Sequence, residues 1–185
     1  MSGTGAPKGK QWNIRRLDVR AFARDAGELD GREPLGAFQR LLEECVTRLD
    51  AEVVWRVEGE ERDEGAGRDP SVWMHMSANA HISMTCQRCL EPVVVAPSAD
   101  RWFRFVASEE IAEQEDEDAE EDVLTWHPLP DVHELVEDEL LMELPLVPMH
   151  DVCPVSVKTQ AGEIDEGESE KPHPFAGLEV LKKTR

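Results

Sequence analysis

The chain has 185 residues, 40 acidic and 20 basic side chains, a net charge of -20 and a mean hydropathy of -0.49. This length suits one domain with polar segments. No apolar run approaches the roughly 20 residues of a membrane helix, and the start has no apolar signal core. Four scattered cysteines do not make a secreted disulfide framework. We therefore expect a cytoplasmic protein with reduced thiols and no membrane association.

Charge is distributed unevenly along the chain. Residues 1–24 hold six bases and one acid, and the chain ends with Lys182, Lys183 and Arg185. Residues 109–122 hold ten acids and no base, which is half of the net charge. Blocks of like charge usually stay solvated, so we expect a disordered acidic loop there. The alternative is an electrostatic attraction for a basic partner.

The first half of the chain predicts a strand, a helix and then further strands. Residues 1–10 form a polar, disordered lead, and Trp12, Ile14 and Leu17 indicate a short first strand. From Pro34 to Leu49, apolar residues recur at spacings of three and four, which predicts a helix of about four turns. Cys45 lies on the apolar stripe of this helix, as expected of a buried thiol.

From residue 51 the apolar period becomes two, which is typical of strands. Val53, Trp55 and Val57 alternate with polar residues, and a polar turn is predicted at 58–68. Short strands then follow over 72–76, 80–86, 93–95 and 102–106, with a return strand at 123–126. Strands joined by polar turns favour an antiparallel sheet.

A second helix is predicted to begin after Asp131, whose side chain and Glu134 form a capping box. Its inward face consists of apolar residues at helical spacing, namely Val132, Leu135, Val136, Leu140 and Leu144. Its acids, Glu137, Asp138 and Glu143, are expected to face water. Pro145 and Pro148 end the helix and start an extended arm. We expect Leu146 and Val147 of this arm to pack within the fold, the alternative being a docking site for a partner.

These elements predict an α+β fold with one antiparallel sheet and two main helices. The domain is expected over residues 11–153, with a flexible tail over 154–185 that ends in a short helix. The sequence contains no βαβ rhythm and no internal repeat.

Cys86 and Cys89 lie between two strand-like segments, at the expected tip of a hairpin. Two thiolates in such a turn suit half of a tetrahedral zinc site, and His150 and Cys153 have the residue types for the other half. A thioredoxin-type redox centre is disfavoured because that chemistry needs the first cysteine at a helix N-terminus. Reduced thiols without metal remain the alternative.

Direct RNA contact would use the arginine and lysine side chains of this acidic chain. The candidates are Arg15, Arg16, Arg101, Arg104, Lys182 and Lys183. Trp73, Trp102 and Phe103 could stack on the nucleobases of RNA, but a role in the protein core is favoured for them. We find no catalytic arrangement or phosphate-binding loop and expect neither an enzyme nor a small-molecule substrate.

Three blocks carry a resemblance to a known family. They are Cys86-Gln87-Arg88-Cys89, the segment from Val136 to Asp151, and Lys171 to Leu178. Together they resemble the YceD family of large ribosomal RNA accumulation proteins, and some relatives look like zinc ribbons with a second Cys pair. The resemblance implies a non-enzymatic factor for synthesis, processing or stability of large-subunit (23S) rRNA.

Two mechanisms remain open within this resemblance, and a third is less favoured. The protein contacts precursor rRNA, or it is an acidic module that holds a basic ribosomal protein or assembly factor. The net charge favours the second. A zinc- or redox-responsive regulator using Cys86 and Cys89 is the third. Candidate partner-binding residues are Glu137, Asp138, Glu139, Leu146, Val147, Pro148, Pro174 and Phe175.

Overall fold

The computed structural model describes residues 11–46, 51–65 and 69–156. The chain divides into two compact units between Pro154 and Val155, and the description below concerns the first. Predictions for the lead at 1–10 and for the tail beyond residue 156 lie outside the described residues. The fold is α+β, as the sequence predicts.

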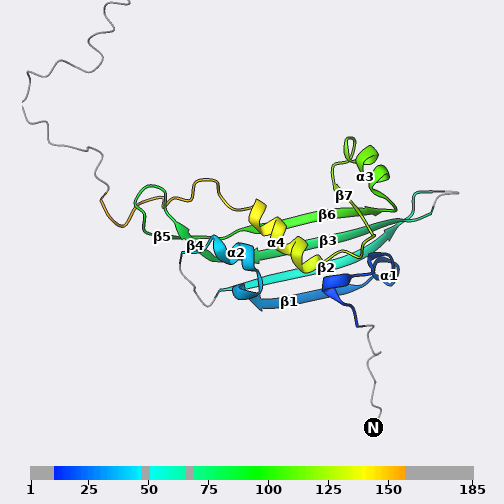
Figure 1. Cartoon of the computed structure of the whole chain (residues 1–185), viewed down its shortest axis with the longest axis horizontal. Coiled ribbons are helices and arrows are strands. Elements are labelled where there is room, and N and C mark those ends of the chain that lie inside the picture. Colours follow the sequence, from blue (N-terminus) through cyan, green and yellow to red (C-terminus); the bar gives the residue numbers. More distant parts are fainter. Residues whose placement is uncertain (1–10, 47–50, 66–68, 157–185) are drawn as a thin grey trace, which may run out of the picture. The chain divides into compact units, whose positions relative to one another are not determined.

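A five-stranded sheet with the order β1-β2-β3-β6-β7 forms the body of this unit (Figure 1). Its strands are β1 (Glu28–Pro34), β2 (Glu52–Arg62), β3 (Ser71–Ala80), β6 (Ser98–Val106) and β7 (Asp122–Thr125). The first four pair antiparallel, while β7 runs parallel to β6. The sheet is therefore mixed rather than purely antiparallel. A separate hairpin consists of β4 (Ile82–Thr85) and β5 (Pro92–Val95).

Helices α1 (Val19–Arg24), α2 (Gln39–Glu43) and α4 (Val132–Met142) pack on one face of the sheet (Figure 1). Two short 3-10 helices, η1 (Ile14–Arg16) and η2 (Leu35–Ala37), precede α1 and α2. The alternation predicted for β2 and β3 is confirmed. The core of the unit is built from buried apolar side chains, including Val53, Val57, Met74, Met76, Phe103, Val136 and Leu140.

Several element predictions are wrong. The segment around Ile14 is a 3-10 helix and not a strand. The four-turn helix predicted from Pro34 to Leu49 is only the short α2 after η2 in the part that the structure describes, which reaches residue 46. Strand β1 was not predicted, and its Gly31 lies so close to the Trp55 ring that a Cβ would be 2.4 Å from it. The turn predicted at 58–68 begins later, because β2 continues to Arg62.

The acidic run is ordered where we expected a disordered loop. Residues Glu109–Asp116 form helix α3, which buries Ala112, and the run ends in β7. Arg104 of β6 accounts for this order, because its guanidinium pairs with Glu115 and with Glu121, the latter at 2.6 Å. The Arg104 side chain is only 17% exposed, so its charge compensates part of the run inside the fold.

Candidate metal centre

The β4–β5 hairpin presents two cysteines from its turn. The N–H of Cys86 donates to the carbonyl of Glu91 at 3.0 Å, and the N–H of Leu90 donates to the carbonyl of Cys86 at 2.9 Å. These bonds close the turn and place Cys89 beside Cys86. Cys86 is buried and Cys89 is half-buried. The prediction of a cysteine pair at a hairpin tip is confirmed.

The second pair of residues comes from the arm that follows α4. Pro145 cannot continue the helix, and the chain turns toward the hairpin. The N–H of Gln87 donates to the carbonyl of Pro148 at 2.8 Å, and the guanidinium of Arg88 donates to the carbonyl of His150. The arm is thus attached to the hairpin turn through its backbone.

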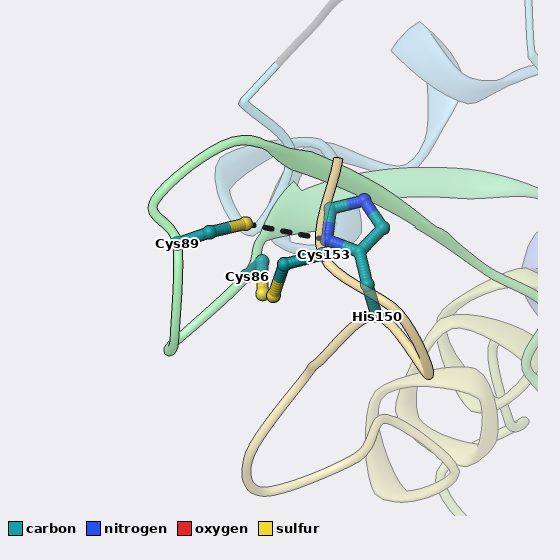
Figure 2. Close-up of side chains that lie close together, drawn as sticks. All are labelled: Cys86, Cys89, His150 and Cys153. Carbon is teal, nitrogen blue, oxygen red and sulfur yellow. Dashed lines mark hydrogen bonds between the residues drawn. The ribbon is translucent and has the colours of Figure 1, made fainter. Parts of the chain in front are cut away.

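Figure 2 shows that Cys86, Cys89, His150 and Cys153 point toward one another from these two segments. Their ligand atoms all lie within 4.8 Å of one another, and Cys89 Sγ is 3.4 Å from His150 Nδ1. The four described cysteines are free thiols. All four residues that we predicted as metal ligands are therefore brought together by the fold.

The protonation of two thiols is strongly shifted within the cluster. Burial raises the pKa of Cys86, but hydrogen bonds from the backbones of His150, Cys89 and Arg88 outweigh burial and lower this pKa to about 5. Burial and hydrogen bonds with Cys89 and Cys86 raise the pKa of Cys153 to about 11. Without metal, the cluster therefore contains both a thiolate and a protonated thiol at neutral pH.

The donor set fits a divalent metal with a preference for sulfur and nitrogen. Zinc bonds of about 2.3 Å to sulfur and about 2.0 Å to nitrogen separate tetrahedral ligand atoms by roughly 3.5–3.8 Å. The 3.4 Å between Cys89 and His150 agrees with this value. The widest separation in the cluster, 4.8 Å at most, would close to it with a contraction of about 1 Å. The cluster could hold one metal ion.

The arginines proposed for RNA contact occupy different surroundings. Arg101 lies 3.4 Å from Glu139 and 3.2 Å from Glu143, and Arg104 is paired as described above. Arg15 is 3.6 Å from Asp131 and more than half exposed, and Arg16 is exposed. Lys182 and Lys183 lie outside the described residues. Nearby carboxylates therefore offset the positive charge of Arg101 and Arg104.

The residues proposed for partner binding also divide into groups. Glu137 and Glu139 are buried, although we expected Glu137 to face water. Asp138 is partly exposed and pairs with Arg40 at 2.5 Å. Leu146 is 99% exposed and Val147 is 56% exposed, whereas Pro148 is buried. Our expectation that Leu146 and Val147 pack within the fold is wrong, while Pro174 and Phe175 lie outside the described residues.

Glu139 was not recognised as a buried group from the sequence. Burial, together with the nearby charge of Asp122, raises its pKa above the ordinary value. Its Oε2 atom makes no hydrogen bond, although Arg101 lies close to it. Its position four residues before Glu143 within an acidic helix face gave no sign of burial.

Fold and site together define an α+β domain with a Cys₃His cluster that could hold a metal ion. The chain belongs to the YceD family: the family described as large ribosomal RNA subunit accumulation protein YceD matches residues 74–182.

A relative from Haemophilus influenzae is named large ribosomal RNA subunit accumulation protein YceD. It is 35% identical over 119 residues, which cover 62% of this chain and 68% of the relative. No solved structure matches this chain. Among the described residues, we find no helix that is both long enough and apolar enough to cross a membrane.

Proposed function

We propose that the protein is a non-enzymatic, cytoplasmic factor that supports accumulation of large-subunit (23S) rRNA. The observation that carries this proposal is that the chain belongs to a family named for that role. The matched residues, 74–182, include the Cys₃His cluster and the arm. No small-molecule substrate enters the proposal. The protein acts on precursor rRNA, on a ribosomal protein or assembly factor, or on both.

Binding of a basic protein is the favoured mechanism. The chain has a net charge of -20, and phosphates need unpaired Lys and Arg side chains. Two of the arginines proposed for RNA contact, Arg101 and Arg104, instead pair with carboxylates. A secondary RNA contact in this proposal comes from the exposed Arg16, from Arg15, which is more than half exposed although it lies 3.6 Å from Asp131, and from the C-terminal lysines.

The Cys₃His cluster is proposed to bind one zinc ion in a structural role. Cys86, Cys89, His150 and Cys153 supply four ligands and leave no open position, as in structural zinc sites. The ion would join the hairpin to the arm, which contribute two ligands each. A zinc- or redox-responsive regulator is a second candidate function, favoured only by the clustering of three thiols around His150.

Two experiments test these proposals. Deletion should lower the ratio of mature large-subunit to small-subunit rRNA, and a plasmid copy of the gene should restore it. An unchanged ratio and normal subunit profiles in the deletion strain would remove the functional proposal. Elemental analysis of reduced, untagged protein should give about one zinc per chain, and Cys86→Ser with Cys89→Ser should abolish it. Protein without zinc would leave the thiols a structural role only.

A further inference from the structure

Large apolar side chains are exposed in the two segments that supply the Cys₃His cluster. Leu90, Met149 and Val152 are 75%, 51% and 85% exposed, and each is the chain neighbour of a cluster residue. Leu146 and Val147 add two more at the start of the attached arm. We call these five residues the knuckle surface. Scattered exposed apolar residues are ordinary, but five of them in two short segments that are bonded to each other favour an interaction surface.

Leu90 gives independent evidence that this surface serves something other than the fold. Its φ is +63°, a left-handed conformation that favours glycine or asparagine over a branched apolar side chain. The side chain is also mostly exposed, so it gains little from burial in the protein. A strained, exposed leucine directly after the second cysteine of the hairpin gains nothing for the fold from its side chain, which supports a contact outside the chain.

Charge determines which class of partner fits this surface. Glu91, Glu143 and Asp151 are exposed in the hairpin and arm segments. The base in these segments, Arg88, is exposed and donates to the carbonyl of His150, and Arg101 of β6 pairs with Glu143 at 3.2 Å. RNA phosphates would therefore meet more acids than bases beside the apolar groups. Apolar residues rimmed by acids instead complement a protein segment that carries apolar side chains between Lys and Arg.

We propose that the knuckle surface is a docking site for an apolar segment, flanked by Lys and Arg, of a basic large-subunit ribosomal protein. This inference rests on the proposed function for the source of the partner. The surface itself follows from the exposure of Leu90 and Leu146 and from the acidic rim. The Cys₃His cluster would fix the relative positions of the hairpin and the arm, which carry the residues of the knuckle surface.

The test uses purified full-length protein and the individually purified proteins of the large subunit as probes. The surface variant is Leu90→Asn with Leu146→Ser, in which asparagine tolerates the left-handed backbone. The matched control is Ile111→Ser, which removes an exposed apolar side chain from α3. At 150 mM salt, we expect at least one basic probe to bind the wild-type protein. The surface variant should bind it at least ten-fold more weakly, and the control should bind within two-fold of wild type.

A photo-crosslinking residue at position 146 identifies the class of partner in cells. We expect a crosslink to the same ribosomal protein that binds in the purified assay. Crosslinks to RNA or to a second copy of the chain, or equal binding by the surface variant and wild type, would overturn the proposal. Wild-type thermal melting of the surface variant shows that lost binding is not lost folding. The rRNA ratio in the deletion strain is read separately, so failure of the proposed function is distinguishable from failure of the docking site.

Discussion

Glu137 provides the sharpest test of how the two halves of the chain are held together. Its Oε1 accepts hydrogen bonds from the backbone N–H groups of Arg40 at 2.8 Å and Leu41 at 3.2 Å. Helix α2 has no side-chain cap of its own, since its N-cap residue is Phe38. A carboxylate of α4 therefore satisfies the first donors of a helix almost a hundred residues away.

Replacing Glu137 with alanine should destabilise the protein by about 3 kcal/mol, because two N–H groups lose their acceptor at a cost of roughly 1–3 kcal/mol each. The ion pair with Arg40 adds little, since the arginine is largely exposed. In a chain of this size, that loss lowers Tm by roughly 6–12 °C. Glu137→Gln keeps an oxygen acceptor and should lose about half as much stability.

Asp138→Ala is the matched control for this substitution. Asp138 pairs with the same arginine, but the carboxylate is 44% exposed and caps no helix. Its loss should change stability by less than about 1 kcal/mol. Urea denaturation followed by circular dichroism and tryptophan fluorescence measures all three variants. Equal losses for Glu137→Ala and Asp138→Ala would refute the capping role of Glu137.

Further predictions concern the buried acid, the edge strand and the arm. Burial raises the pKa of Glu139, so the contribution of this group to stability is complete below the unfolded pKa of 4.5 and is lost as pH rises through the folded pKa. The free energy of unfolding of Glu139→Gln should therefore rise relative to that of the wild type by about 1 kcal/mol between pH 4 and 7. A difference in urea denaturation that does not change with pH would contradict this. Gly31→Ala should lower stability by about 2 kcal/mol, because its Cβ would meet the Trp55 ring, whereas Gly36→Ala, with open space around it, should melt like wild type. Leu146→Ser with Val147→Ser should shift stability by no more than about 0.5 kcal/mol, because both side chains are exposed; a large drop in Tm would show that the arm packs on the fold.

The local sequence pattern was sufficient to predict the structure where the surroundings of a residue are set by residues close to it in the chain. Alternation predicted β2 and β3, because both strands cross the middle of a sheet with one helix-covered face. The start of α4 was predicted because the Asp131 side chain accepts from the N–H of Glu134 within the same turn. The Cys86–Cys89 pair was placed at a hairpin tip for the same reason.

Sequence reasoning failed where a distant partner decides the structure. β1 is an edge strand with few apolar side chains, and Trp55 of the neighbouring strand covers its Gly31. The acidic run contains nothing that neutralises it, since Arg104 lies outside it on β6. The acids of α4 looked like a solvated face, yet Glu137 is buried against α2. None of these contacts is encoded in the spacing of nearby residues.

Helix α4 links these long-range contacts to the candidate metal centre. His133 stacks on Phe38 before α2, Glu137 caps α2, and Glu139 lies against Arg101 of β6. Helix α4 is therefore held against both α2 and β6, and the arm begins directly after it. The arm supplies His150 and Cys153, while the hairpin supplies the other two cluster residues.

Because the cluster draws on two segments, a bound metal would stabilise only the state in which arm and hairpin are joined. The same joining brings together the cluster residues Cys89, His150 and Cys153, whose chain neighbours are Leu90, Met149 and Val152. Metal bound at the cluster would therefore reinforce the backbone hydrogen bonds that already hold the two parts of the knuckle surface together. Loss of a single cluster cysteine should consequently weaken partner binding even though no cysteine side chain needs to contact the partner.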